Sequence, residues 1–422
     1  MMNRKSFVTN TTVLAAMYPF LNSIESCSAK NHSAGKKIFV FVQLAGGNDG
    51  LHTLVPLDNY TVLSKARKNI FIPEHKLLPI KGQSNLALHP ALSGVRDLFN
   101  NQLAGFVQGV GYEHPNFSHF RSSDIWLTGS SADTVMYSGW MARYLETKYK
   151  NYPNGYPNKK FPFPPAIKIG DTGTFLFQGD AIDMSIVLNP NIKFDKSAVI
   201  AQNDKEDSFG YHEVQSIREI LLQTDRYATV IKEALKCPFA SSKLYPAKGE
   251  NSLADQLKVV AQLINAGLET SVYLVDLKGF DTHVEQSDFS NTTKGNHANL
   301  LTKVSQAITC FWDDVVHMGR ENEVAGMTFS EFGRRIISTS GLGTDHGSSQ
   351  PILFFGANIN KQLIGHNPVF PEKITSNDNL SLQYNFKSVY RSILKQWFNA
   401  NENIINSVIP EKFEELSMFN YR

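Results

Sequence analysis

The chain has 422 residues, of which 42% are hydrophobic and 19% are charged, a composition typical of a globular protein with a large buried core. Its 41 basic and 39 acidic residues leave a net charge of +2, which gives no electrostatic reason to expect a nucleic-acid partner. The three cysteines are too few for a disulfide framework and lack the spacing of a metal site.

The N-terminal segment predicts an export signal over residues 1–35. Arg4 and Lys5 precede a short apolar stretch and then small and polar residues, which is the order of parts in such a signal. The letters NRKSFV resemble a twin-arginine leader with Lys5 in place of the second arginine, and Cys27 is a weak candidate for a lipoprotein site. The route stays open between twin-arginine, general secretory and lipoprotein export, and a frayed helix is the structural alternative. We expect an exported protein, periplasmic or associated with the outer membrane.

Strand and helix patterns alternate along the rest of the chain. Residues 38–44 form a nearly continuous apolar run, which indicates a strand buried on both faces. Amphipathic spacing predicts helices over Ser252–Leu268, with Ser252 and Asp255 as a capping box, and over His297–Gly319. After the N-terminal segment the sequence has no apolar run of about 18 residues, so no transmembrane helix is predicted there.

This alternation predicts an α/β fold. Helices between buried strands are typical of a three-layer α/β/α sandwich with a largely parallel central sheet. We expect residues 36–422 to form a single domain, because no repeat or low-complexity linker divides them. A proline- and aromatic-rich stretch near residues 148–165 indicates a surface excursion from that domain.

Acidic and imidazole side chains follow several of the predicted strands. In a parallel sheet the carboxyl ends of the strands lie along one edge, where residues distant in the sequence meet. Oxygen and nitrogen donors of this kind suit Zn²⁺, Mn²⁺ or Mg²⁺ better than metals that prefer thiolates. The sequence therefore predicts a divalent metal site, and its candidate ligands are Asp49, Asp281, His283, Glu331, Asp345 and His346.

Each candidate also has a purely structural interpretation. Asp49, in the sequence GGNDG, could shape a turn by bonding to its own backbone, and Asp281 could cap a helix. Glu331 could form an ion pair with Arg334, and the sequence TDHG around His346 also occurs in ordinary turns. The combination favours a site more strongly than any single residue, because all of these groups come after predicted strands.

Eight segments, in order, carry a resemblance to a known family. They are QLAGGNDGLHTLVP, LALHPAL, SHFRSSDIWLTG, SGWMARYL, LADQLKVVAQLINAGL, GFDTHVEQ, MTFSEFGRRI and GTDHGSSQPILFFG. Together they resemble the exported bacterial domain-of-unknown-function family fifteen-oh-one, over about residues 36–400. That family is grouped with the alkaline phosphatase and sulfatase superfamily, although it has no settled reaction of its own. The resemblance implies an alkaline-phosphatase-like sandwich with metal ligands and a nucleophile at one sheet edge.

The resemblance also implies roles for the first candidate ligands. Asp49, after the first strand, is similar to the first metal-binding aspartate of the superfamily. Asp281 and His283 resemble a later Asp and His ligand pair, although only one residue separates them here, which is closer than the usual spacing.

The last segments depart from the superfamily pattern at one position. Glu331 stands in place of a ligand aspartate, but Phe332 stands where the superfamily has a histidine. His346 resembles the final ligand histidine, and Asp345 is its neighbour. The resemblance therefore implies a metal centre in which one of the usual two-metal ligands is missing, with Asp345 as a candidate to compensate.

The superfamily places a nucleophile at a helix N-terminus, where the helix dipole and free N–H groups stabilise an anion. In the segment HPNFSHFRSSDIWLTG, Ser118 is the first candidate for this role and Ser122 is the second. His119 could be a metal ligand or a base, and Arg121 or Arg334 could hold an anionic substrate. The structural alternative is that Ser118 only caps the helix.

Two functions are consistent with these residues. The first is an exported, metal-dependent hydrolase that acts on a phosphate or sulfate ester, either a small anionic ester or a polymer. The second is a non-catalytic envelope protein that keeps the scaffold and binds a polymer or a co-secreted partner. A purely structural periplasmic protein, whose polar strand ends form salt bridges, is a third interpretation.

Overall fold

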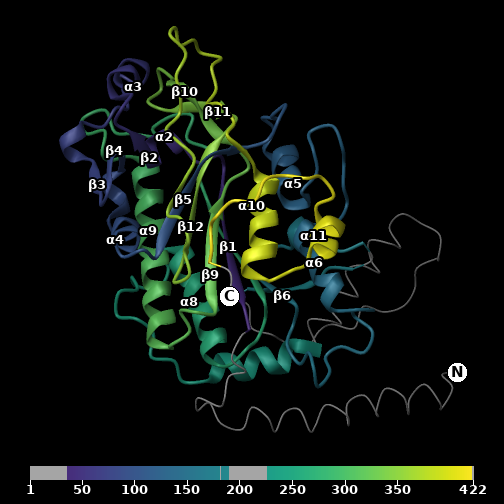
Figure 1. Cartoon of the computed structure of the whole chain (residues 1–422). Coiled ribbons are helices and arrows are strands. Elements are labelled where there is room, and N and C mark those ends of the chain that lie inside the picture. The colour runs from purple at the N-terminus through teal and green to yellow at the C-terminus, as the bar shows by residue number, and fades with distance from the viewer. Residues whose placement is uncertain (1–35, 181, 190–225, 421–422) are drawn as a thin grey trace, which may run out of the picture.

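The computed structural model describes residues 36–180, 182–189 and 226–420, so the predicted export signal lies outside the described residues. A nine-stranded sheet forms the centre of the molecule (Figure 1). Across the sheet the strands are β13 (Leu363–Ile364), β5 (Ala104–Gly111), β12 (Gln350–Gly356), β9 (Val324–Phe329), β1 (Ile38–Ala45), β8 (Val272–Lys278), β6 (Ala166–Ile169) and β7 (Ser185–Leu188), and β14 (Tyr384–Asn385) pairs with β5. All neighbouring pairs are parallel except the two made by β12.

Helices cover both faces of this sheet, which confirms the predicted α/β fold. Alternate residues of β1 point to opposite faces, and each set enters a separate hydrophobic core. Val40 and Val42 face one helical layer, and Phe39 and Phe41 face the other. The first layer contains α4 (Ser93–Asn100), α8 (Ser252–Asn265) and α9 (Asn296–His317); the second contains α5 (His119–Thr128), α6 (Trp140–Lys148), α10 (Phe386–Ser392) and α11 (Glu402–Val408).

The two long predicted helices are present as α8 and α9, but the start of α8 differs from the prediction. The N-cap is Asn251, whose side chain accepts a hydrogen bond from the N–H of Ala254. Ser252 is therefore the first helical residue and not the cap. The predicted capping box is wrong by one residue, since an asparagine one position earlier satisfies the free N–H group.

Smaller elements lie beyond the carboxyl ends of the parallel strands, at the top of Figure 1. A hairpin of β10 (Gly333–Ser338) and β11 (Thr344–Gly347) follows β9. Asp345 and His346 thus lie within a short strand and not after one, as the sequence had predicted. The other elements there are α2 (Gly50–Thr53), α3 (Tyr60–Ala66) and a three-stranded sheet of β2 (Leu54–Pro56), β4 (Gln83–Leu88) and β3 (Leu78–Ile80).

The segment between α6 and β6 contains the predicted excursion. Its aromatic side chains pack on one another, with the rings of Tyr149 and Phe161 4.6 Å apart. Among the described residues, no helix is both long and apolar enough to cross a membrane.

Candidate metal centre

Three loops and one hairpin meet at the carboxyl edge of the sheet. Asp281 and His283 follow the end of β8, and Glu331 follows the end of β9. His119 is the first residue of α5, in the connection that leaves β5, and His346 lies in β11. These segments are far apart in the sequence, and the common direction of β1, β5, β8 and β9 brings them together.

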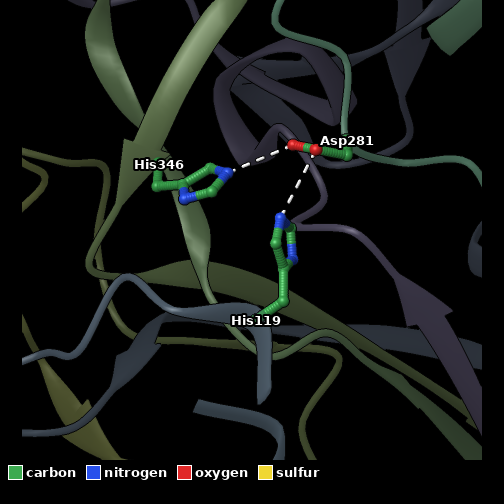
Figure 2. A group of neighbouring side chains, drawn as sticks. All are labelled: His119, Asp281 and His346. Atoms are coloured by element: carbon green, nitrogen blue, oxygen red, sulfur yellow. Dashed lines mark hydrogen bonds and ion pairs between the residues drawn. The ribbon is translucent and has the colours of Figure 1, made fainter. Parts of the chain in front are cut away.

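The centre of this group is Asp281, toward which two imidazoles point (Figure 2). The Nε2 atom of His346 lies 3.1 Å from its Oδ1 atom, and the Nε2 atom of His119 lies 3.4 Å from its Oδ2 atom. One donor atom from each of the three residues lies within 4.8 Å of the other two. Donor atoms this close can bind a common ion after small movements, since zinc lies about 2 Å from each ligand.

His283 contacts two members of this group as a further candidate donor, outside the mutually close set of three. Its Nε2 atom lies 3.1 Å from Oδ1 of Asp281 and 2.8 Å from Nε2 of His346. We call His119, Asp281, His283 and His346 the ligand group. The side chains of His119, His283 and Asp281 are 35%, 40% and 46% exposed, so a solute can reach the group from one side.

The opposite nitrogen of each imidazole contacts an oxygen that can only accept a hydrogen bond from it. Nδ1 of His119 lies 2.8 Å from Oε1 of Glu331, and Nδ1 of His283 lies 3.1 Å from Oδ1 of Asp345. Nδ1 of His346 lies 2.8 Å from the carbonyl oxygen of Phe117. When an ion binds at Nε2, the Nδ1 proton of each ring has one of these acceptors to donate to. Such partners are typical of imidazoles that bind metals.

The contacts of the Nε2 atoms have an electrostatic consequence. Nε2 of His283 lies 2.8 Å from Nε2 of His346, and both lie 3.1 Å from Oδ1 of Asp281. Lone pairs at that distance repel unless a proton or a cation lies between them. Three imidazole nitrogens and one carboxylate are a donor set that suits Zn²⁺. The residues therefore fit a divalent metal ion.

The protonation equilibria of two members favour metal binding. Burial alone would raise the pKa of Asp281, but hydrogen bonds from His346 and Arg334 outweigh it and lower that pKa to about 2. Burial lowers the pKa of His346 below its ordinary value, against the opposing effect of Asp281. At neutral pH the pair therefore consists of a carboxylate and a neutral imidazole, which are the states that bind a metal.

Glu331 and Asp345, predicted as ligands, contact the Nδ1 atoms of His119 and His283, on the side of each ring away from Asp281. Besides accepting from His119, Oε1 of Glu331 accepts a hydrogen bond from the N–H of Gly46 at 2.9 Å, and Oε2 accepts from Ser330 at 3.1 Å. Asp345 accepts from His283. In this arrangement both carboxylates orient imidazoles.

Asp49 does not join the group either. It is fully buried, and its Oδ2 atom accepts hydrogen bonds from Arg67 and from Gln286, each at 2.6 Å. Among the described residues, the set of mutually close metal-ligating atoms contains His119, Asp281 and His346 but not Asp49. The predicted ligand role of Asp49 is not supported by its position, because a buried arginine already neutralises it.

The two arginines proposed to hold a substrate anion are engaged by the protein. Arg334 is buried and donates to the carbonyl oxygens of Gly46, Gly47, Phe280 and Thr344 and to Asp281. Arg121 donates to the carbonyl oxygens of Ser131, Ala132 and Thr134. Both guanidinium groups fix neighbouring loops, so the geometry does not support the predicted anion clamp.

The two candidate nucleophiles differ in access. Ser118 is exposed and is the N-cap of α5, but its side chain makes no capping hydrogen bond. Ser122 is fully buried, and its hydroxyl bonds to Tyr112 at 2.8 Å and to the carbonyl oxygen of Glu331 at 2.5 Å. Ser118 therefore stays a candidate, whereas Ser122 is a packing residue.

Phe332 packs against two imidazoles of the ligand group. It is buried, and its ring centre lies 4.9 Å from that of His119 and 4.3 Å from that of His346. Gly47 makes room for it, since a Cβ atom there would lie 2.4 Å from Cε2 of Phe332. The phenyl ring thus occupies space beside two imidazoles. The sequence pattern indicates only that Phe332 stands where the superfamily has a histidine, and not that its ring packs on two imidazoles.

Comparison with known proteins finds the family that the motifs resemble, over part of the chain. Residues 194–391 match the family model described as "Protein of unknown function (DUF1501)". No curated protein sequence matches the chain.

Several solved structures are similar to this chain. The C-terminal periplasmic domain of EcEptC from Escherichia coli has a TM-score of 0.38 and 10% identity, over 93% of this chain and 92% of that chain. A protein in the alkaline phosphatase superfamily from Vibrio parahaemolyticus has a TM-score of 0.37 and 10% identity, over 85% and 66%. The lipoteichoic acid synthase LtaP from Listeria monocytogenes has a TM-score of 0.34 and 9% identity, over 95% and 80%. Likenesses this distant concern the arrangement of the fold alone.

Proposed function

We propose that this member of the DUF1501 family is a metal-dependent hydrolase of phosphate or sulfate esters. One divalent ion, with zinc the best match to the donors, binds to His119, His283, His346 and Asp281. The observation that carries the proposal is the convergence of three Nε2 atoms on the Asp281 carboxylate, with an acceptor beside each Nδ1. Such an ion supplies Lewis acidity toward an anionic oxygen.

Residues around the ligand group can perform the remaining tasks. Ser118 precedes His119 and carries a free hydroxyl at the N-terminus of a ten-residue helix, where a developing anion is stabilised. It is therefore our candidate nucleophile. Phe332 packs on the imidazoles of His119 and His346. Arg334 donates to four carbonyl groups of the surrounding loops. Both residues therefore stabilise the loops that carry the ligand group.

The substrate class and cellular location are part of the same proposal. A carboxylate and neutral imidazoles around a divalent ion suit an anionic ester, either small or polymeric, and the open side of the ligand group gives it access. We propose that the protein is exported and acts in the periplasm or at the outer membrane.

Metal content and ester hydrolysis test this function directly. The purified protein should retain divalent metal after gel filtration and hydrolyse an aryl phosphate or aryl sulfate. His346→Ala should lose at least about 90% of the metal, since it removes one of four donors. His317→Ala is the matched control, because His317 is 69% exposed at the end of α9 and should retain full metal. A folded wild-type protein with neither metal nor turnover would refute the proposal.

A non-catalytic envelope protein is the second candidate, and one observation favours it. Arg121 and Arg334 both donate to carbonyl groups, so neither guanidinium is free to hold a substrate. Such a protein would bind metal and a polymer or co-secreted partner without turnover. It would retain binding in Ser118→Ala, whereas an enzyme that uses Ser118 would lose hydrolysis.

A further inference from the structure

We propose that Gln286 is a positioning residue that sets the distance between the two segments carrying Asp281, His283 and His346. We also infer that Asp49 and Arg67 act on the metal centre through Gln286 and not as ligands. This inference rests on the proposed metal centre and adds a support that the motifs did not reveal.

Gln286 is fully buried and bridges two threonines. Its Oε1 atom accepts hydrogen bonds from the hydroxyls of Thr344, at 2.7 Å, and Thr282, at 3.2 Å. Its Nε2 atom donates to Oδ2 of Asp49 at 2.6 Å. Since a carboxylate only accepts, this last contact fixes which end of the amide is nitrogen. The oxygen must therefore face the threonines.

The two threonines are the residues through which the bridge reaches the ligands. Thr282 lies between Asp281 and His283, and Thr344 lies two residues before His346. Backbone hydrogen bonds join the segments directly: the N–H of Thr344 donates to the carbonyl oxygen of Thr282 at 3.2 Å, and the N–H groups of Glu285 and Ser287 donate to the carbonyl oxygens of Gly341 and Leu342. Gln286 adds side-chain links beside the first of these bonds. A change of its side chain therefore moves one ligand segment relative to the other.

Asp49 holds the amide in place because it is itself anchored. Nη1 of Arg67 lies 2.6 Å from Oδ2 of Asp49, and both side chains are buried. The other donors of Arg67 bond to the carbonyl oxygens of Ile336 and Arg335 in β10, at 2.9 and 2.7 Å. The guanidinium therefore cannot turn away from Asp49. This chain of contacts runs from α3 and its following turn to the metal-binding loops.

The chemistry of this bridge distinguishes glutamine from glutamate. Gln286→Glu would place a second carboxylate against Asp49, where like charges repel in a buried setting. Gln286→Ala would leave Asp49 with one partner fewer and the two threonine hydroxyls without their common acceptor. Both variants should loosen the ligand geometry. Loss of a residue that orients metal ligands typically costs about 10- to 100-fold in affinity.

Cobalt binding tests the inference, with Co²⁺ as a spectroscopic substitute for zinc. The full chain is titrated with Co²⁺ against a chelator to obtain Kd, and the visible spectrum of the bound ion is recorded. In Gln286→Ala and Gln286→Glu, Kd should rise about 10- to 100-fold and the spectrum should change. A purely structural role would lower stability without changing the spectrum of the bound ion.

Gln396→Ala is a matched control in the same chain. Gln396 is also a buried glutamine, which donates to the carbonyl oxygen of Leu416 at 2.6 Å and accepts from the N–H groups of Met418 and Phe419. It lies in the short helical turn after α10, remote in sequence from every ligand. The variant should lose stability but keep the wild-type Kd and spectrum.

A second pair of variants covers the case in which Gln286→Ala does not fold. Thr344→Val removes the hydroxyl and should weaken Co²⁺ binding, whereas Thr344→Ser keeps the hydroxyl and should restore it. If the wild type binds no Co²⁺, the metal centre itself is wrong. If the wild type binds but Kd and spectrum are unchanged in these variants, or change equally in Gln396→Ala, the metal centre stands and the role of Gln286 is wrong.

Discussion

Acidification from pH 7 to pH 5 should strongly destabilise the protein, because three buried imidazoles resist protonation. His52, His89 and His297 are at most 4% exposed, and the ring centre of His52 lies 4.7 Å from that of His89 and 5.1 Å from that of His297. Burial lowers the pKa of His52 and of His297 to about 3 each, and that of His89 to about 2. Nδ1 of His52 and Nδ1 of His297 lie 2.9 Å apart, so a proton added to the ring whose Nδ1 accepts also disrupts their contact.

The sign and size of the effect follow from linkage. An unfolded histidine has a pKa of about 6.5, so between pH 6.5 and pH 3 the unfolded chain binds more protons than the folded one, and stability falls as pH falls. Each histidine then contributes a loss of about 2 kcal/mol between pH 7 and pH 5. Three such groups lose about 6 kcal/mol, which is comparable to the whole stability of many domains, about 5–15 kcal/mol.

Urea denaturation at pH 7 and pH 5 measures this loss. His89→Gln should reduce the difference between the two pH values by about one third, because one titrating group is gone. The substitution also removes the hydrogen bond from the N–H of Ala91 to His89. That loss lowers the stability of the variant equally at pH 7 and pH 5, so it does not affect the difference between the two pH values. His317→Gln, at an exposed position, should leave the difference unchanged. Equal stability of the wild type at both pH values would refute the reasoning.

Three further predictions concern the metal centre. Ser118→Ala should retain wild-type metal content by mass spectrometry yet lose aryl-ester hydrolysis, and unchanged turnover would exclude Ser118 as nucleophile. Glu331→Leu removes the acceptor for His119, so Kd for Co²⁺ should rise about 10- to 100-fold in chelator competition. Arg334→Met leaves four buried carbonyl groups without their donor, so unfolding free energy should fall by at least about 3 kcal/mol; a loss below about 1 kcal/mol would show that these hydrogen bonds contribute little.

The arrangement of strand ends could be predicted from the sequence because it depends on short-range patterns. The apolar run of residues 38–44 and the helical spacing of residues 252–268 are visible without a structure. Once those patterns predict a parallel sheet, the positions of Asp281 and Glu331 after their strands place both at one edge. The same reasoning placed His346 near them, although its strand was not foreseen.

The partners of the buried charges could not be predicted in the same way. Asp49 finds its counter-ion 18 residues away, in Arg67, and its amide partner 237 residues away, in Gln286. A sequence pattern does not distinguish an aspartate that faces an open site from one neutralised by a buried arginine, because the difference arises only in tertiary packing. For the same reason the sequence predicts a substrate contact for Arg334, although its side chain is buried.

The charges around the ligand group provide a further argument for a divalent ion. Three carboxylates take part, since Asp281 faces the imidazoles and Glu331 and Asp345 hold two of them from behind. One guanidinium, that of Arg334, contacts this set, through Asp281. With the imidazoles neutral, the formal charge of the set is two negative charges. A divalent cation between the Nε2 atoms neutralises it, whereas a single shared proton leaves an excess negative charge at a partly desolvated position, which is unfavourable.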